Sequence, residues 1–192
     1  MCDTMSYFPA FIKFDNKKVL LVGAGNIALE KLEKLLIFTK DIVIIALEFS
    51  PEILAVIKEE KLFYEKRAYK KGDIKDMSMV VVAIDDIGLQ KSIYKESQDY
   101  KCLCNSVDSI EYCDFIFPSL IKNEDLTIAV STSGSSPAFA KHFRIYLEGL
   151  IPDGINTFLE EMRELRASLP KGKERMKMLD TKAKEYIRGW KE

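Results

Sequence analysis

The chain has 192 residues, of which 47% are hydrophobic and 31% charged, and its formal net charge at pH 7 is −1. This length suits one domain with an appendage, and the near balance of charge gives no reason to expect a nucleic-acid partner. No apolar run approaches the ~20 residues of a membrane helix, and Asp3 and Lys13 break up the N-terminal apolar residues that a secretory signal would need. We therefore expect a cytoplasmic protein, bound to no membrane, whose cysteines are reduced.

The first half of the chain alternates strand-like and helix-like segments. Apolar runs predict strands at 18–22, 42–46, 62–64, 79–84 and 102–107, and helical patterns lie between them at 27–38, 51–60 and 87–99. The run at 79–84 is apolar throughout, as expected of a parallel strand that is covered on both faces. The alternation predicts an α/β, Rossmann-like fold with a doubly wound parallel sheet that binds its ligand at the carboxyl ends of the strands.

The pattern changes after Asp108. The order predicted from there is a strand at 115–121, a strand at 126–130, a Ser/Thr-rich loop at 131–136, a helix from 137 to about 149, and a charged helical tail from 155 with a break at 170–172. The chain is therefore expected to divide into a Rossmann domain at 1–113, a small α+β segment at 114–150 and a helical C-terminal region at 151–192.

A glycine-rich turn follows the first strand, with the sequence Gly23-Ala24-Gly25-Asn26-Ile27-Ala28. Gly23 permits a tight turn, Gly25 leaves room for a pyrophosphate, and Ala28 is small enough for the helix to lie close to the strand. The start of the helix offers free N–H groups and the positive end of its dipole to phosphates. The pattern predicts a dinucleotide site; the alternative is an ordinary strand–turn–helix that is rich in small residues.

Carboxylates follow three of the predicted strand ends. Glu48 lies 23 positions after Gly25, near the expected place for an acid that binds an adenosine ribose and repels the 2′-phosphate of NADP. The alternative is that Glu48 is a solvated acid near the start of a helix. Asp108 follows the strand at 102–107 and is a candidate general base if partial burial tunes its pKa, or else a turn former. Asp85 and Asp86 face the same edge, and a helix cap explains them equally well.

The Ser/Thr-rich loop leads into a helix with Pro137 at its first position. Its hydroxyl and N–H groups, together with Lys141 and Arg144, would hold carboxylates or phosphates. The alternative is a flexible loop with Ser136 as an ordinary N-cap.

The candidate metal ligands are three cysteines and the single histidine of the chain. A zinc site can be imagined from Cys102, Cys104, Cys113 and His142, but their spacing matches no standard pattern. We expect buried thiols and no metal site.

Several of these segments in order resemble one family, the precorrin-2 dehydrogenases of sirohaem synthesis, which include the N-terminal module of trifunctional sirohaem synthases. The resemblance covers roughly residues 5–150 and lies in Phe8-Pro9-Ala10-Phe11, the turn Val22–Ala28, Ala83–Asp86, Asn105-Ser106-Val107-Asp108, Cys113–Ser119 and Ser131–Ala140. The Asn-x-Val-Asp and Phe-x-x-Pro segments and the Ser-rich stretch are more specific than the glycine turn.

The resemblance implies NAD-dependent dehydrogenation of precorrin-2, a tetrapyrrole, to sirohydrochlorin. In some members the same cleft inserts ferrous iron, so a ferrochelatase activity is open here. The family's essential aspartate falls on Asp108, and its cofactor positions fall on Asn26, Ile27, Leu47 and Glu48, beside Gly23 and Gly25. Members form intertwined homodimers through the segment that corresponds to about 115–150 here.

The substrate loop departs from the family pattern. The residues expected to bind substrate are Ser131, Thr132, Ser133, Ser136, Lys141 and Arg144. Ser133 replaces a family glycine, and Lys141 replaces an arginine and its bidentate fork. Two other functions stay open at this point: a non-catalytic NAD(H)-sensing module, and a chelatase without useful dehydrogenase activity.

Overall fold

The computed structural model describes residues 7–191, and the chain divides into two compact units. The N-terminal unit is Tyr7–Ile116, and the C-terminal unit begins at Phe117. The segment at 114–150 and the helical region at 151–192, which the sequence separates, thus fall almost entirely in one unit. Cys2 lies outside the described residues.

The N-terminal unit alternates strands and helices. Its elements are β1 (Val19–Val22), α1 (Asn26–Leu36), β2 (Ile42–Ala46), α2 (Pro51–Glu60), β3 (Phe63–Lys66), β4 (Met79–Val82), α3 (Ile87–Tyr100), β5 (Leu103–Ser106) and the 3-10 turn η1 (Ile110–Tyr112). The prediction of an α/β fold is confirmed, and each predicted strand and helix of this unit lies within two residues of its observed bounds.

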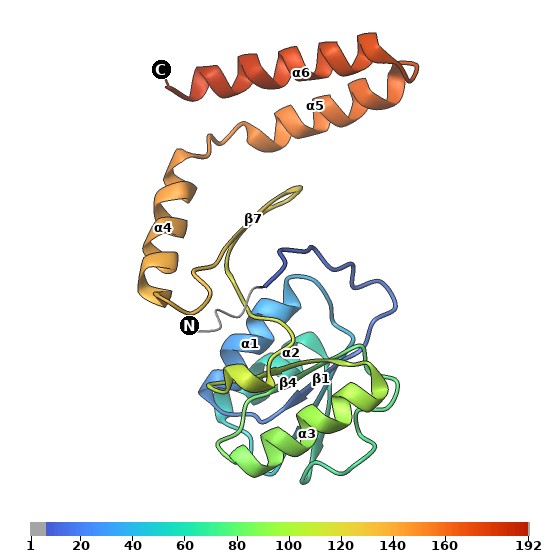
Figure 1. Ribbon diagram of the computed structural model, residues 1–192, viewed down its shortest axis with the longest axis vertical. Helices are drawn as coiled ribbons and strands as arrows, with labels where there is room; N and C mark the ends of the chain where they lie inside the picture. The colour runs from blue at the N-terminus through green and yellow to red at the C-terminus, as the bar shows by residue number, and fades with distance from the viewer. Residues whose placement is uncertain (1–6, 192) are drawn as a thin grey trace, which may run out of the picture. The chain divides into compact units, whose positions relative to one another are not determined.

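The five strands form one parallel sheet in the order β3-β2-β1-β4-β5. The chain winds outward from β1 in both directions, so α1 and α2 cover one face and α3 covers the other (Figure 1). Such a sheet binds ligands beyond the carboxyl ends of the two strands where the winding direction reverses, which are β1 and β4 here. β1 and β4 are buried at every position, and they form the centre of the core.

The helix ends follow from particular side chains. Ser50 Oγ accepts the Ile53 N–H at the start of α2, where Pro51 occupies the first helical position, and Asp86 caps α3 by accepting the Leu89 N–H. The cap role considered for Asp86 is therefore confirmed. Helix α1 differs, because its N-cap residue is Gly25 and no side chain caps it among the described residues.

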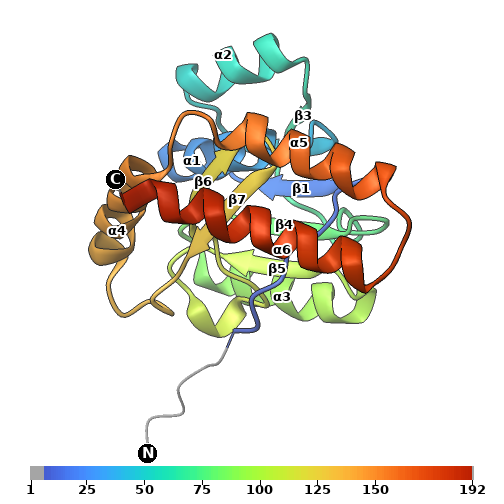
Figure 2. The same cartoon turned by 90° about the horizontal axis from the view of Figure 1, so that it is seen from above.

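In its described part, the C-terminal unit holds a hairpin and three α-helices. Its elements are β6 (Ser119–Asn123), β7 (Leu126–Val130), α4 (Pro137–Leu150), α5 (Ile155–Ser168), α6 (Lys173–Arg188) and the 3-10 turn η2 (Gly189–Lys191). Helices α5 and α6 run antiparallel side by side (Figure 2), with the rings of Phe158 and Tyr186 stacked at 3.8 Å. Within residues 7–191, no helix has both the length and the apolar character needed to cross a membrane.

The strand predicted at 115–121 begins only at Ser119. Pro118 has no N–H to donate to a ladder, so pairing with β7 starts after it. The preceding residues lie along β5 instead: Asn105 Nδ2 donates to the Phe115 carbonyl at 2.8 Å, and the Asp114 N–H donates to the Cys104 carbonyl at 2.7 Å. The first four residues of that prediction were wrong for this reason.

Candidate functional site

The turn after β1 requires glycine at Gly23. Its φ is +108°, and a Cβ there would lie 2.1 Å from the Ala83 carbonyl oxygen, a distance that no side chain can occupy. The Gly23 N–H donates to the Ile45 carbonyl at 2.9 Å, which fixes the turn against β2 as well. The tight turn predicted from the sequence is confirmed, and the close approach of the loop after β4 is its second cause.

Gly25 is glycine for a different reason. A Cβ at Gly25 would meet no atom within 4 Å, so the fold itself does not demand a bare α-carbon there. Because no described side chain caps α1, the first-turn N–H groups of Asn26, Ile27 and Ala28 are left for a ligand or solvent. An open approach and uncapped N–H groups fit the pyrophosphate of a dinucleotide.

A pocket of about 670 Å³ opens at this turn. It is lined by the turn Val22–Ala28, the end of β2 with its following residues (Ile45–Glu48), the segment Arg67–Tyr69 after β3, the segment Ala83–Asp85 after β4, and Leu89. All six residues predicted to bind the cofactor therefore lie around one pocket: Gly23, Gly25, Asn26, Ile27, Leu47 and Glu48.

The loop that carries Glu48 is tied to the glycine turn. The Ser50 N–H donates to the Ala24 carbonyl at 3.0 Å, so the residues after β2 are held beside the glycine turn. Leu47 is 66% exposed, and Glu48 is exposed as well. Both side chains are thus accessible to a ligand in the pocket.

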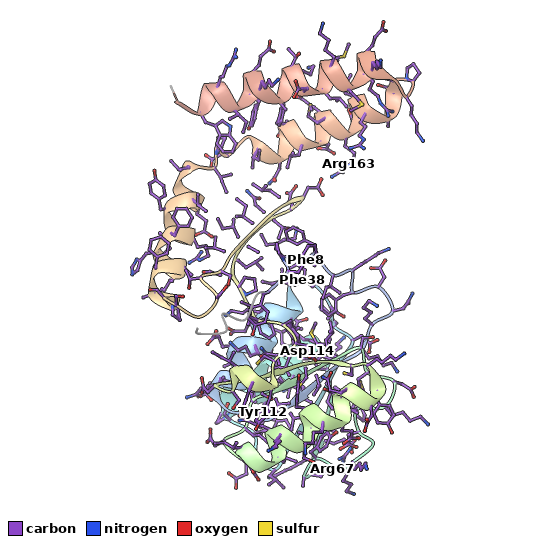
Figure 3. The ribbon with its side chains drawn as sticks, viewed as in Figure 1. Phe8, Phe38, Arg67, Tyr112, Asp114 and Arg163 are labelled. Carbon is purple, nitrogen blue, oxygen red and sulfur yellow. The ribbon has the colours of Figure 1, made fainter. Side chains whose placement is uncertain are left out.

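The segment after β3 contributes residues that sequence reasoning missed. Arg67, which is labelled in Figure 3, lines the pocket and donates to Asp73 through both terminal nitrogens, at 2.6 and 2.9 Å, and to Glu65 through Nε at 2.6 Å. The hydrogen bonds that Arg67 donates to Asp73 and then to Glu65 raise the pKa of Arg67. Burial acts in the opposite direction on Asp73, but the hydrogen bonds from Arg67 and the Lys70 N–H outweigh it and keep the pKa of Asp73 below its usual value.

A buried carboxylate anchors the same segment to α3. Glu96 is 6% exposed and accepts hydrogen bonds from Tyr69 Oη at 2.9 Å and from the Gly72 N–H at 2.6 Å. Burial, followed by the Glu96 hydrogen bond, raises the pKa of Tyr69. The connection from β3 to β4 contains no helix, so these contacts supply the order that a crossover helix would otherwise give.

Asp108 lines a second, smaller hollow of about 190 Å³. This hollow shares Ile27, Ala83, Ile84 and Asp85 with the larger pocket, so the two adjoin at the carboxyl edge of the sheet. Asp108 is exposed, without the partial burial considered for a base, and its φ is +62°. Aspartate and asparagine tolerate that conformation better than most residues, so Asp108 is a turn residue at least.

A buried amide fixes the loop around Asp108. Gln90 Nε2 donates to the Ile84 carbonyl at 2.6 Å, and Gln90 Oε1 accepts from Ser109 Oγ at 2.5 Å. Gln90 itself is 4% exposed. The loop after β5 is thereby bound to the loop after β4, which forms a wall of both hollows.

The Ser/Thr-rich loop belongs to the C-terminal unit and is internally bonded. Ser131 Oγ accepts the Ser133 N–H at 3.0 Å, Thr132 Oγ1 accepts the Ser136 N–H at 3.0 Å, and Ser136 Oγ caps α4 through the Phe139 N–H at 3.2 Å. The N-cap predicted at Ser136 is confirmed. Of the two cations predicted here, Arg144 pairs with Glu148 at 2.6 Å, and Lys141 is exposed.

The three cysteines that the structure describes are free thiols in and beside β5. Cys102 and Cys104 are 2% and 0% exposed, which confirms the prediction of buried thiols, and burial raises the pKa of each to about 12. Cys113 donates to the Ser106 carbonyl at 3.1 Å. Across the described residues, no group of three or more His, Cys, Asp or Glu side chains gathers as metal ligands would.

Two family models match the chain. The model described as "Putative NAD(P)-binding" matches residues 10–119, and the model described as "Sirohaem biosynthesis protein central" matches residues 123–148. The first match spans more than half of the chain and includes every residue that lines the two hollows.

Two curated relatives have the same level of sequence identity to this chain. "Siroheme synthase" of Pseudoalteromonas translucida is 34% identical over 151 residues, which is 79% of this chain and 32% of the relative. "Siroheme synthase" of Psychrobacter cryohalolentis is 34% identical over 167 residues, which is 86% of this chain and 32% of the relative. The chain thus spans about a third of the length of these relatives.

A solved structure has the same fold. The chain matches "SirC, precorrin-2 dehydrogenase" with a TM-score of 0.73 and 21% sequence identity. The match covers 96% of this chain and 99% of the other, so both units have counterparts in that structure.

Proposed function

The chain belongs to the NAD(P)-binding family whose model matches residues 10–119, and from that premise we propose that it is an NAD-dependent precorrin-2 dehydrogenase of sirohaem biosynthesis. The observation that carries this proposal is the pair of adjoining hollows at one edge of the sheet. One has the features of a dinucleotide pocket, and the other presents the Asp108 carboxylate across shared walls. The similarity to siroheme synthases supports the choice of substrate.

We assign cofactor binding and proton transfer to different residues. Gly25 and the first-turn N–H groups of α1 bind the pyrophosphate, and Glu48 binds the adenosine ribose. Bound NAD supplies the hydride acceptor for oxidation of precorrin-2 to sirohydrochlorin. Asp108 accepts the proton that leaves the substrate, and Gln90 and Ser109 hold its loop against the loop after β4. Asp108 thereby acts at the hollow that shares Ile27 with the cofactor pocket.

We assign the carboxylates of the tetrapyrrole to the loop at 131–136 with Lys141. The hydroxyls of Ser131, Thr132 and Ser136 accept backbone N–H groups, which orients them and leaves each hydroxyl hydrogen to be donated. Ser133 and Gly134 both have positive φ, so the loop curves sharply in front of α4. Lys141 adds an exposed cation one turn into that helix, where it complements an anionic substrate.

We further propose that the protein is a homodimer. Helix α4 exposes a row of stacked aromatic rings: Phe139 and Phe143 at 5.6 Å, then Phe143 and Tyr146 at 6.4 Å. Phe139 is 58% and Tyr146 62% exposed. An apolar row of this kind, beside a two-stranded sheet with open edges, suits a contact with a second copy.

The free thiols suit a reducing compartment, and we place the protein in the cytoplasm.

The proposal is tested by mixing the purified protein with NAD and enzymatically made precorrin-2 and recording the absorption spectrum. The expected result is the sirohydrochlorin spectrum together with NADH. A second arm adds ferrous or cobaltous ion as substrate, which reveals metal insertion in the same preparation. If NAD binds and no oxidation follows, the chain is an NAD(H)-sensing module. Metal insertion into supplied sirohydrochlorin without oxidation would make it a chelatase.

A further inference from the structure

Arg67 is the only basic residue that lines the dinucleotide pocket within the described chain. The last paired residues of β2 and β3 are Ala46 and Lys66, so Leu47 and Arg67 leave the sheet at the same level. Arg67 therefore belongs to the same end of the pocket as Glu48. A guanidinium at this end is the group that a nucleotide 2′-phosphate would require.

The Arg67 guanidinium is already engaged. Asp73 accepts two parallel hydrogen bonds from it, at 2.6 and 2.9 Å, Glu65 accepts a third at 2.6 Å, and the Ala68 carbonyl accepts a fourth at 3.1 Å. The Arg67 side chain is 25% exposed and that of Asp73 14% exposed, so water screens this pair less than an open surface pair. Asp73 is held in turn by the Lys70 N–H at 2.7 Å.

We infer that Asp73 and Glu65 make the pocket selective for NAD over NADP by withholding Arg67 from the 2′-phosphate. With Arg67 neutralised, the charge at this end is set by carboxylates, Glu48 included, and a phosphate dianion is repelled. A 2′-hydroxyl carries no charge and is unaffected. This inference rests on the proposed function only in taking the pocket to bind a dinucleotide, and it concerns selectivity rather than the oxidation step.

If the Arg67–Asp73 ion pair served only to stabilise the structure, the dinucleotide affinities would respond differently to its loss. The ion pair also orders the helix-free connection from β3 to β4, where Ile74 is fully buried. If that order were its whole purpose, loss of the pair would weaken NAD and NADP equally or leave both unchanged. Selectivity instead requires that release of Arg67 strengthens NADP binding in particular.

The experiment is calorimetric titration of the 192-residue chain with NAD and with NADP, for the wild type, three variants and one control variant. Asp73→Asn should tighten NADP binding by about tenfold or more, because a freed guanidinium then meets the phosphate, and should change NAD affinity by less than about twofold. Arg67→Gln on its own should change neither affinity by more than about twofold. The double variant Arg67→Gln/Asp73→Asn should lose the gain in NADP affinity.

Glu60→Gln serves as the control, because it removes one carboxylate from the Lys40–Glu60 pair, which does not line the pocket. It should leave the ratio of the two affinities unchanged. An unchanged ratio in Asp73→Asn, or equal weakening of both dinucleotides, would overturn the inference while NAD binding by the wild type left the proposed function standing. Binding of neither dinucleotide by the wild type would overturn both. A loss of NADP affinity in Arg67→Gln alone would show that Arg67 is not withheld.

Discussion

Gly23 lies so close to Ala83 that a Cβ on the glycine would stand 2.1 Å from the alanine carbonyl oxygen. Gly25, two residues later, has nothing within 4 Å of the same position. The structure therefore constrains the two glycines of this turn differently. Gly23 is fixed by the fold, where β1 and the loop after β4 approach each other, whereas the fold leaves Gly25 open and its proposed constraint is the ligand.

The first prediction concerns substitutions at these two glycines, one of which should affect NAD binding and the other stability. Gly25→Val should abolish NAD binding, because its side chain fills the approach to the N–H groups of α1, and should leave the cooperativity of unfolding unchanged. Gly23→Ala should instead destabilise the protein, by more than the roughly 1 kcal/mol typical of point substitutions, because both the φ of +108° and the contact with Ala83 forbid a Cβ. The measurements are calorimetric NAD titration and urea unfolding. A folded Gly25→Val protein that binds NAD normally would remove the pyrophosphate from this turn.

The glycine turn was predictable because each of its positions has a local cause. Strand, turn and helix follow one another within a few residues, and the caps at Asp86 and Ser136 depend only on side chains three residues from their partners. Arg67 was missed for the opposite reason. The third strand was predicted to end at residue 64, two residues short of its observed end at Lys66, so Arg67 was not recognised as the residue that leaves the sheet beside Leu47.

Contacts over longer distances along the chain carry no sequence signal of their own. Gln90 and Ser109 come from different segments, and nothing in either segment indicates that a buried amide will join them. The same holds for Glu96, which accepts a hydrogen bond from Tyr69, 27 residues away along the chain. The edge of the sheet was therefore predictable as the location of the site, while the side chains that shape its walls were not.

The second prediction concerns association of the chain through α4. Tyr146→Glu places a charge in the exposed aromatic row, and burial of that charge in an interface would be unfavourable. Light scattering of the wild type at micromolar concentration should give about twice the chain mass of 22.0 kDa, and the variant should give the mass of one chain. Met176→Glu is the control, because Met176 is 70% exposed on α6 rather than α4. A monomeric wild type would contradict the dimer, and a dimeric Tyr146→Glu protein would place the interface elsewhere.

The third prediction is a dependence of stability on alkaline pH. Burial raises the pKa of the Cys104 thiol to about 12, whereas an unfolded cysteine titrates near 8.5, a typical value for the free side chain. The resulting stabilisation is complete below the unfolded pKa and is lost as the pH rises toward the folded value. Cys104→Ala lacks this loss. The difference in unfolding free energy between wild type and variant should therefore shrink by about 1.2 kcal/mol between pH 9 and pH 10.

Urea unfolding in the presence of a thiol reductant at pH 7, 9 and 10 measures this difference. Other titrating groups are common to both proteins and cancel in the comparison, except Cys102, whose pKa is raised by burial and also by Cys104. A difference that stays constant across the range would mean that Cys104 ionises as readily in the folded protein as in the unfolded chain.

The last prediction concerns Asp108. Asp108→Asn preserves the size of the side chain and suits the positive φ, so the turn should be retained. If Asp108 accepts the substrate proton, single-turnover sirohydrochlorin formation should fall roughly 10²–10⁴-fold. NAD affinity should hardly change, because Asp108 lines only the smaller hollow and is absent from the walls of the larger one. Asp99→Asn, which removes the same charge from an exposed position on α3, should leave both quantities unaltered.

The possible results assign Asp108 to distinct roles. Near-normal turnover would leave it as the turn residue that its φ already suits, and solvent would then be the proton acceptor. Loss of NAD binding would mean that the walls shared by the two hollows depend on the carboxylate, so that it shapes the cofactor pocket. A loss confined to metal insertion would place Asp108 in a chelatase step. Only reduced oxidation with intact NAD affinity agrees with a base held in place through Gln90 and Ser109.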